Sequence, residues 1–224
     1  MKAKRLKAGD TIGIVAPASP SDPAKVERAI KHISDMGYSV KAGKSVYSSR
    51  GYLSGTDELR ASDINDMFAD DEVRAIFCLR GGYGSQRILD LVDFEGICNN
   101  PKIFMGYSDI TALLNAIYQK CGLITFHGPM GGDFAGGLEK RTKKAMKNIL
   151  ESTEPAGELP NPVTPEVVEE GKGSGKLAGG NLSIVAASLG TPYEVDTRNR
   201  ILLLEDVFEE PYSVDRMLTQ LKLA

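Results

Sequence analysis

Short unbroken runs of apolar residues alternate along the first half of the chain with apolar residues at helical spacing. Residues 11–15 form the first run and predict a buried strand. Asp22 and Pro23 then supply an N-cap and a first-turn proline for a helix, whose apolar positions between residues 26 and 33 share one face. Gly37 marks the end of this helix.

The same alternation continues to about residue 126. Further strands are predicted at residues 38–42, 74–79, 102–105 and 123–126, and further helices at residues 57–69, around 88–92 and at 111–120. Strands that alternate with helices predict an α/β fold built on a doubly wound, mostly parallel sheet with helices on both faces.

A change of composition predicts a domain boundary. Residues 151–170 follow a basic helix and contain four prolines and six acidic residues but no lysine or arginine, as in an exposed connector. We therefore expect an N-terminal domain at residues 1–152, a linker at 153–172 and the start of a smaller α/β domain at 173–224. In this last part a Gly-Gly-Asn turn precedes a short helix, a strand at 201–204 ends in Glu205, and an amphipathic helix follows.

Composition narrows the possible partners. The net charge of −3, with basic residues spread along the chain, argues against nucleic acid as a partner. The apolar run at residues 12–16 is too short for a signal-peptide core, and no segment has membrane-spanning length, so no membrane association is expected. Cys78, Cys98 and Cys121 are odd in number and form no C-x-x-C pair. We expect neither a disulfide nor a zinc site, and a reducing, cytoplasmic setting.

Chemically unusual loops follow four of the predicted strands. These loops are APASP (16–20), RGGYGS (80–85), GYSD (106–109) and FHGP (126–129). Ligands of open α/β sheets bind outside the carboxyl ends of the strands, so the four loops are expected to surround one site. The G-x-G-x-x-G pattern that begins at Gly82 has Arg87 where its last glycine should stand, so we predict no dinucleotide and no cofactor.

Ser108 is a candidate nucleophile in one of these loops. A serine on a tight turn between strand and helix exposes its hydroxyl, and Gly106 lets such a turn pack closely. The structural interpretation is that Ser108 or Asp109 caps the following helix. Ile110 replaces the second glycine of the G-x-S-x-G pattern.

Two further features are open to both a catalytic and a structural interpretation. The consecutive glycines of RGGYGS suit an oxyanion donor or a phosphate cradle, or a plain turn in which Ser85 caps the next helix. Glu205 ends an apolar run, where a charge requires a partner. It is either catalytic or paired with Arg216, which could instead pair with Asp206.

Taken in order, RGGYG, GYSDIT, FHGP, the GGN turn and LLLEDVFEEPYSVDRML resemble the LD-carboxypeptidases, which include muramoyl-tetrapeptide carboxypeptidases and microcin-immunity hydrolases. The resemblance implies a cytoplasmic, homodimeric serine peptidase with a Ser-Glu-His triad that recycles murein peptides. It assigns Ser108 as nucleophile and Glu205 as the orienting acid. The backbone N–H groups of Gly82 and Asp109 are the implied oxyanion hole. The implied substrate-binding residues are Arg80, Gly81, Tyr83 and Asn181.

The chain contains two histidines, and neither matches the histidine of the family. His32 lies in the first helix, and His127 follows the strand at 123–126. The family places its catalytic histidine in a later segment, so the sequence is expected to be truncated and nearly inactive. His127 then shapes the loop or faces the substrate, or acts as a substitute base.

Two hypotheses of a different class stay open. The chain could be a non-catalytic module that keeps the cleft and binds a peptide or nucleotide-like ligand. It could also be a Cys-His hydrolase that uses Cys121 and His127, although Cys121 comes before its strand and not after it.

Overall fold

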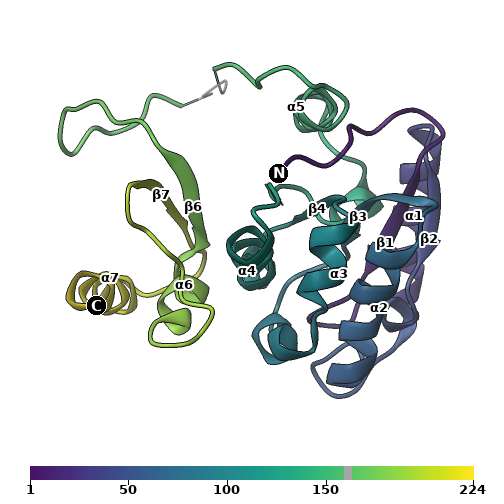
Figure 1. Ribbon diagram of the computed structural model, residues 1–224, viewed down its shortest axis with the longest axis horizontal. Helices are drawn as coiled ribbons and strands as arrows, with labels where there is room; N and C mark the ends of the chain where they lie inside the picture. Colours follow the sequence, from purple (N-terminus) through teal and green to yellow (C-terminus); the bar gives the residue numbers. More distant parts are fainter. Residues whose placement is uncertain (159–162) are drawn as a thin grey trace.

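A five-stranded parallel sheet forms the centre of the N-terminal part. The computed structural model describes residues 1–158 and 163–224 of the chain (Figure 1). The strands are β1 (Thr11–Val15), β2 (Ser39–Ala42), β3 (Val73–Cys78), β4 (Ile103–Gly106) and β5 (Phe126–His127). Their spatial order is β2-β1-β3-β4-β5, and every neighbouring pair is parallel. The predicted doubly wound α/β fold is therefore confirmed.

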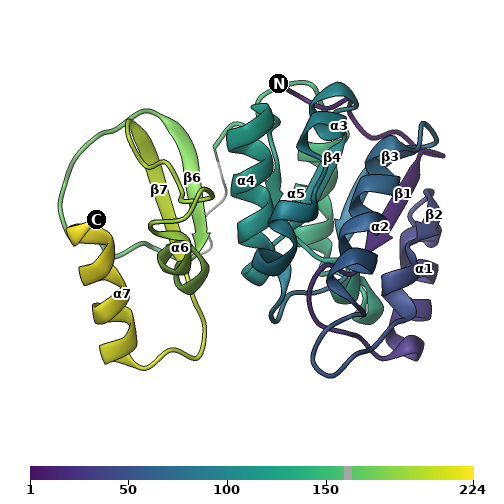
Figure 2. The same cartoon turned by 60° about the horizontal axis from the view of Figure 1, so that its bottom comes forward.

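Helices cover both faces of this sheet (Figure 2). The α-helices are α1 (Pro23–Asp35), α2 (Asp57–Ala69), α3 (Phe94–Asn99), α4 (Thr111–Cys121) and α5 (Lys140–Leu150), and the 3-10 helices are η1 (Lys44–Tyr47), η2 (Ser85–Leu91), η3 (Ser108–Ile110) and η4 (Gly131–Gly136). Helices α2, α3 and α4 pack on one face, where Phe68 stacks on Phe104. Helices α1 and α5 and η4 pack on the other, where Phe77 stacks on Phe134. Alternate residues of the inner strands β1, β3 and β4 thus enter two separate cores.

The local signals of the sequence fix several helix starts. The Asp22 carboxylate accepts a hydrogen bond from the Ala24 N–H at 2.8 Å, and Pro23 opens α1 as predicted. Thr56 caps α2 in the same way through the Leu59 N–H at 3.2 Å. These side chains satisfy N–H groups that a helix leaves without an internal partner.

Two predicted elements differ in the structure. The helix expected around residues 88–92 is the 3-10 helix η2, and a separate helix α3 follows because the Asp93 side chain caps a new start through the Gly96 N–H. The strand expected at 123–126 shortens to β5. The start of the predicted strand does not pair with β4, because the Ile124 N–H donates to the Met1 carbonyl at 3.0 Å.

The expectation of no disulfide is wrong. Cys98 of α3 and Cys121 at the end of α4 form a disulfide with their Cα atoms 5.0 Å apart. The two helices pack side by side, so residues 23 positions apart in sequence become neighbours. Cys78 is the free, buried cysteine. Cysteine usage therefore no longer supports a reducing compartment.

A smaller unit follows residues 151–175, whose described part forms no helix or strand. It consists of β6 (Lys176–Asn181), α6 (Leu182–Ser188), β7 (Arg200–Glu205) and α7 (Pro211–Leu223), with β6 and β7 parallel. The unit docks on α4. The Asn115 amide donates to the Gly179 carbonyl at 2.8 Å and accepts from the Gly179 N–H at 3.3 Å, and Gln119 accepts from the Asp196 N–H.

Apolar side chains of this unit remain open to solvent. Ile201 and Leu203 of β7 are 42% and 50% exposed, and Leu218 of α7 is 45% exposed.

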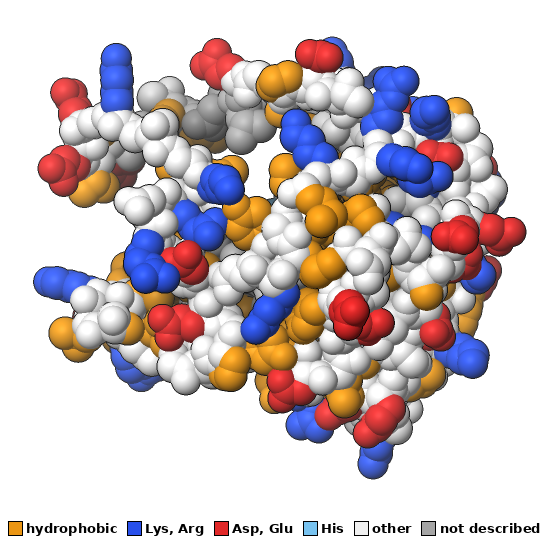
Figure 3. Space-filling model, viewed as in Figure 1, with side chains coloured by type: hydrophobic (Ala, Val, Ile, Leu, Met, Phe, Trp, Pro, Cys, Tyr) orange, Lys and Arg blue, Asp and Glu red, His pale blue; other side chains and the backbone are white. Residues whose placement is uncertain are grey.

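Basic and acidic side chains are interspersed on the face seen in Figure 3. Among the described residues, no helix combines the length and apolar character that crossing a membrane requires.

Candidate active site

Ser108 occupies a strained turn at the carboxyl end of β4. Its φ angle is 59°, a left-handed value that residues other than glycine seldom adopt. Ile110 packs so closely on this turn that a Cβ on Gly106 would lie 2.8 Å from Ile110 Cγ2. Strain of this kind persists only where the surrounding structure holds it, and it is frequent at active sites. The geometry resembles the strand-to-helix turn that carries the nucleophile of α/β-hydrolases.

The loop after β3, residues 80–85, lies close to this serine, and we call it the glycine loop. A Cβ on Gly81 would lie 3.0 Å from Ser108 Oγ and 3.3 Å from the Asp109 nitrogen. Gly82 has a φ of 109°, and a Cβ there would collide with Ser19 Oγ. Only glycine satisfies both conditions, so the backbone of the loop can approach a group bound at Ser108.

Asp109 links the two loops instead of capping its own helix. Its buried carboxylate accepts a hydrogen bond from the Ser85 N–H at 2.8 Å. The interpretation of Asp109 as a helix cap is therefore wrong, because its side chain joins the loop after β4 to the loop after β3. Ser85 does not cap through its side chain either.

The loop after β1 completes the edge. Arg80 Nη1 donates to the Pro20 carbonyl at 3.1 Å, and the Tyr83 N–H donates to Ser19 Oγ at 3.3 Å. Both residues are exposed. Their predicted contacts with substrate remain predictions, but the hydrogen bonds show that the glycine loop is fixed relative to the loop after β1.

Sequence reasoning missed Arg60, a fully buried cation on α2. Its guanidinium donates to the carbonyls of Pro17 and Gly84 and pairs with Asp57. It thereby holds the loop after β1 against the glycine loop. The available signal was an arginine in register with Ile64 and Phe68 on the apolar face of a helix.

Glu205 ends β7 at the same edge of the molecule. It stands opposite Asn181 in the β6–β7 pair, and its Oε1 lies 3.9 Å from Nε2 of His127. His127 in turn stands opposite Gly106 in the β4–β5 pair, two residues before Ser108. Glu205 Oε1 is buried and accepts no hydrogen bond from the described residues. Burial lowers the pKa of His127, and the Glu205 charge opposes this shift.

Asn181 positions the smaller unit next to the serine turn. Its N–H donates to Thr111 Oγ1 at 3.0 Å, and its side chain caps α6 through the Ile184 N–H. The same amide donates to Asp206 at 3.0 Å. Its predicted role in substrate binding remains a prediction.

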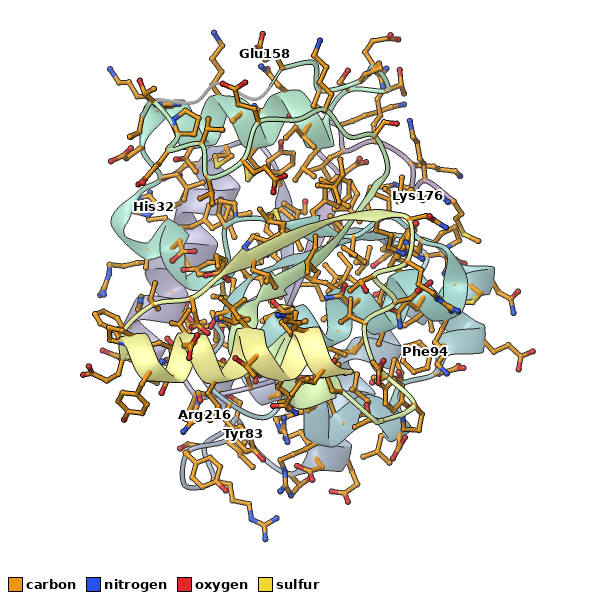
Figure 4. The ribbon with its side chains drawn as sticks, turned by 90° about the vertical axis from the view of Figure 1, so that its left-hand side faces the viewer. His32, Tyr83, Phe94, Glu158, Lys176 and Arg216 are labelled. Atoms are coloured by element: carbon orange, nitrogen blue, oxygen red, sulfur yellow. A yellow bond between two sulfur atoms is a disulfide. The ribbon has the colours of Figure 1, made fainter. Side chains whose placement is uncertain are left out.

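The suggested pairing of Arg216 with an acid is not present. Asp206 bonds to Asn181 and the Ser183 N–H, whereas Arg216 bonds to Ser213 at 3.4 Å and packs over the Tyr212 ring. Figure 4 shows Arg216 on the outer helix α7.

The structure gives Cys121 and His32 other contacts, so neither is a nucleophile or base of this site. Cys121 is bonded to Cys98, so the proposed Cys-His hydrolase is wrong. His32 is half-buried on α1, and its Nδ1 lies 2.6 Å from the Phe134 carbonyl oxygen. The described residues contain no cluster of three or more side chains suited to hold a metal ion.

Comparisons with known proteins match both parts of the chain. The model of the LD-carboxypeptidase N-terminal domain matches residues 12–128, and that of the C-terminal domain matches residues 174–224. A probable murein peptide carboxypeptidase of Bacillus subtilis is 48% identical over 225 residues, which cover 99% of this chain and 70% of the relative.

Solved structures show the same fold. An MccF-like protein from Bacillus anthracis superimposes with a TM-score of 0.88 at 30% identity, over 100% of this chain and 76% of that one. A muramoyltetrapeptide carboxypeptidase from Oxalobacter formigenes has a TM-score of 0.80 at 32% identity, over 95% and 71% of the two chains. With two family models and a close relative in agreement, the chain belongs to the LD-carboxypeptidase family.

Proposed function

We propose that this protein is a serine carboxypeptidase that removes the terminal D-amino acid from a murein tetrapeptide. The observation that carries the proposal is the strained Ser108 turn, against which the glycine loop packs so closely that a Cβ on Gly81 would lie 3.0 Å from the hydroxyl oxygen. A hydroxyl held this way, beside backbone N–H groups, is equipped for acyl transfer. The name of the Bacillus subtilis relative supports murein peptides as the substrate.

In the proposed reaction, Ser108 Oγ attacks the carbonyl carbon of the third residue and transfers its proton to an imidazole. The N–H groups of Gly82 and Asp109 stabilise the oxyanion. The tetrahedral intermediate collapses, the C–N bond breaks, and the imidazolium returns the proton to the departing D-amino acid. Water then hydrolyses the ester on Ser108 by the same steps.

Glu205 is the proposed acid that orients the imidazole. Its buried Oε1 accepts no hydrogen bond from the described residues, and a carboxylate in that state has capacity for an imidazole N–H. The family resemblance supports an imidazole supplied by a later segment of the C-terminal domain. His127, 3.9 Å from Glu205, is then a neighbour of the triad, not its base.

Location and assembly are part of the same proposal. The resemblance supports a cytoplasmic homodimer that acts on peptides recovered from the cell wall.

The decisive experiment compares two tetrapeptides that differ only in the chirality of the last residue. A chain lengthened by the C-terminal segment of the Bacillus subtilis relative should release D-alanine but not L-alanine, as measured by chiral liquid chromatography. Ser108→Ala should abolish the release, and Ser62→Ala, at an exposed serine of α2, should serve as the matched serine control. Release that survives Ser108→Ala would exclude this serine as the nucleophile.

A non-catalytic binding module remains the second candidate. It is favoured by one observation, that no histidine among the described residues hydrogen-bonds Ser108. The lengthened chain would then bind the tetrapeptide and release nothing.

A further inference from the structure

Two exposed tyrosine rings lie beside the glycine loop. Tyr83 is 46% exposed and Tyr52 is 63% exposed. Their ring centroids are 5.8 Å apart with an angle of 57° between the planes, so the rings form an open wedge. Figure 4 shows Tyr83 near the lower margin of the molecule. Tyrosines combine an apolar face with a polar tip and are favoured where a ligand contact is partly wet.

Both rings stand on fixed backbone. Tyr52 is at the tip of a turn closed by two hydrogen bonds between Arg50 and Leu53, at 2.7 and 3.2 Å. The next residue, Ser54, donates its N–H to the Ala18 carbonyl at 2.9 Å. Tyr83 is held through its N–H on Ser19 Oγ. The wedge therefore exists before a ligand arrives, which lowers the entropy cost of binding.

A polar hollow of about 430 Å³ opens beside Tyr52. Its lining consists of Arg50, Tyr52, Leu53, Gly55, Thr56, Asp57, Glu58 and Arg87. Arg87 pairs with Asp57 through two contacts at 2.7 and 3.1 Å, so opposite charges balance within the hollow. Planar donors and acceptors next to aromatic faces suit a neutral ring that carries several hydroxyl and amide groups.

The distance from the nucleophile matches the length of the substrate. The scissile bond of a tetrapeptide lies three residues from the sugar to which a murein peptide is attached, and three extended residues span about 10 Å. Gly81 lies so close to Ser108 that a Cβ on it would come within 3.0 Å of the hydroxyl oxygen, and Tyr83 is two residues farther along the chain, within about 7 Å of Gly81. The centroid of the Tyr52 ring lies 5.8 Å from that of the Tyr83 ring. The wedge thus begins within reach of the sugar end of the peptide.

We propose that Tyr52 and Tyr83, with the hollow lined by Arg50, Asp57 and Arg87, form a subsite for the amino sugar of a murein peptide. This inference rests on the proposed function, because it takes Ser108 as the point of cleavage. The sugar stacks its apolar face on the tyrosines and directs its hydroxyl and N-acetyl groups into the hollow.

The test measures binding to the 224-residue chain by isothermal titration calorimetry, so it does not require catalysis. The probes are N-acetylmuramyl-L-alanyl-D-isoglutamine and the same dipeptide without the sugar. We expect the sugar to strengthen binding about tenfold. Tyr52→Ala and Tyr83→Ala should remove this preference, whereas Tyr212→Ala, at an exposed tyrosine of α7, should keep it.

Equal binding of the two probes, or a preference that survives both tyrosine variants, would overturn the subsite. Binding of adenosine or uridine monophosphate that depends on Tyr52 would overturn the sugar assignment in favour of a nucleobase. The circular dichroism spectrum of each variant checks its fold. Loss of D-alanine release with the sugar preference intact would overturn the proposed function alone, since the two readouts are independent.

Discussion

Nε2 of His127 lies 3.9 Å from Oε1 of Glu205, although the two residues belong to different sheets. This distance exceeds that of a hydrogen bond, and the interaction is electrostatic. The interaction brings together the carboxyl ends of β5 and β7. The proposed triad acid therefore lies at the edge of the sheet that carries Ser108.

The pair makes a prediction for titration by NMR. Burial lowers the pKa of His127 and the negative charge of Glu205 raises it, so Glu205→Gln should lower this pKa further. The chain has two histidines, and the resonance of His32 on α1 serves as the internal control. An unchanged His127 titration in the variant would show that the pair does not persist in solution.

The same shift predicts a dependence of stability on pH. His127 has a folded pKa below the value of 6.5 that is usual for histidine, so the unfolded chain binds the proton more tightly. Its contribution to stability is complete above about pH 6.5 and is lost as the pH falls through the lower folded value. His127→Gln should therefore reduce the loss of stability that occurs as the pH falls below about 6.5, as measured by urea unfolding. A variant with the same acid limb as the parent chain would contradict this.

The contact between Asn115 and Gly179 makes a prediction for the smaller unit. Asn115→Ala removes a side chain that meets both backbone groups of Gly179 and leaves them unpaired at a partly buried interface. We expect the free energy of opening for residues 176–224 to fall by about 1–3 kcal/mol. Hydrogen–deuterium exchange should therefore accelerate in this segment and not in β1 or β3.

Asn148→Ala, at an exposed position of α5, is the matched control for that experiment. In the parent chain, too, residues 176–224 should exchange faster than the first domain, because so small a unit buries little surface of its own. Uniformly slow exchange across both parts in a dilute monomer would argue against this.

The disulfide between Cys98 and Cys121 predicts a redox-dependent stability. Closing a loop over 23 positions should stabilise the fold by about 3 kcal/mol in the chain-entropy model. Dithiothreitol should lower the melting temperature of the parent chain but not that of Cys121→Ser. Equal melting temperatures under oxidising and reducing conditions would indicate that the bond does not form in solution.

The last prediction concerns the base. Loss of the histidine in a serine protease costs on the order of a millionfold in turnover, about as much as loss of the whole triad. The 224-residue chain should therefore release almost no D-alanine from a murein tetrapeptide, and the lengthened chain should release it readily. Release rates within about tenfold of each other, together with their loss in His127→Ala, would identify His127 as the base.

Much of the fold follows from local pattern. Helix α2 begins and ends where the apolar spacing predicts, and β1 coincides with its apolar run. Such elements depend on contacts between residues a few positions apart, which the sequence displays directly. The Ser108 turn is similar, because Gly106 and the adjoining strand and helix are all local.

The shape of the site depends on contacts that no local pattern encodes. Strand order decides that β1 lies beside β3 and β3 beside β4, and alternation of strands and helices does not specify that order. The buried bonds of Arg60, the bridge from Asp109 to Ser85 and the approach of Glu205 to His127 all join loops that become neighbours only through it. The sequence alone thus determined the elements and the residues available for chemistry. Tertiary packing decided which of them meet, because proximity between distant segments is set by the free energy of the whole fold.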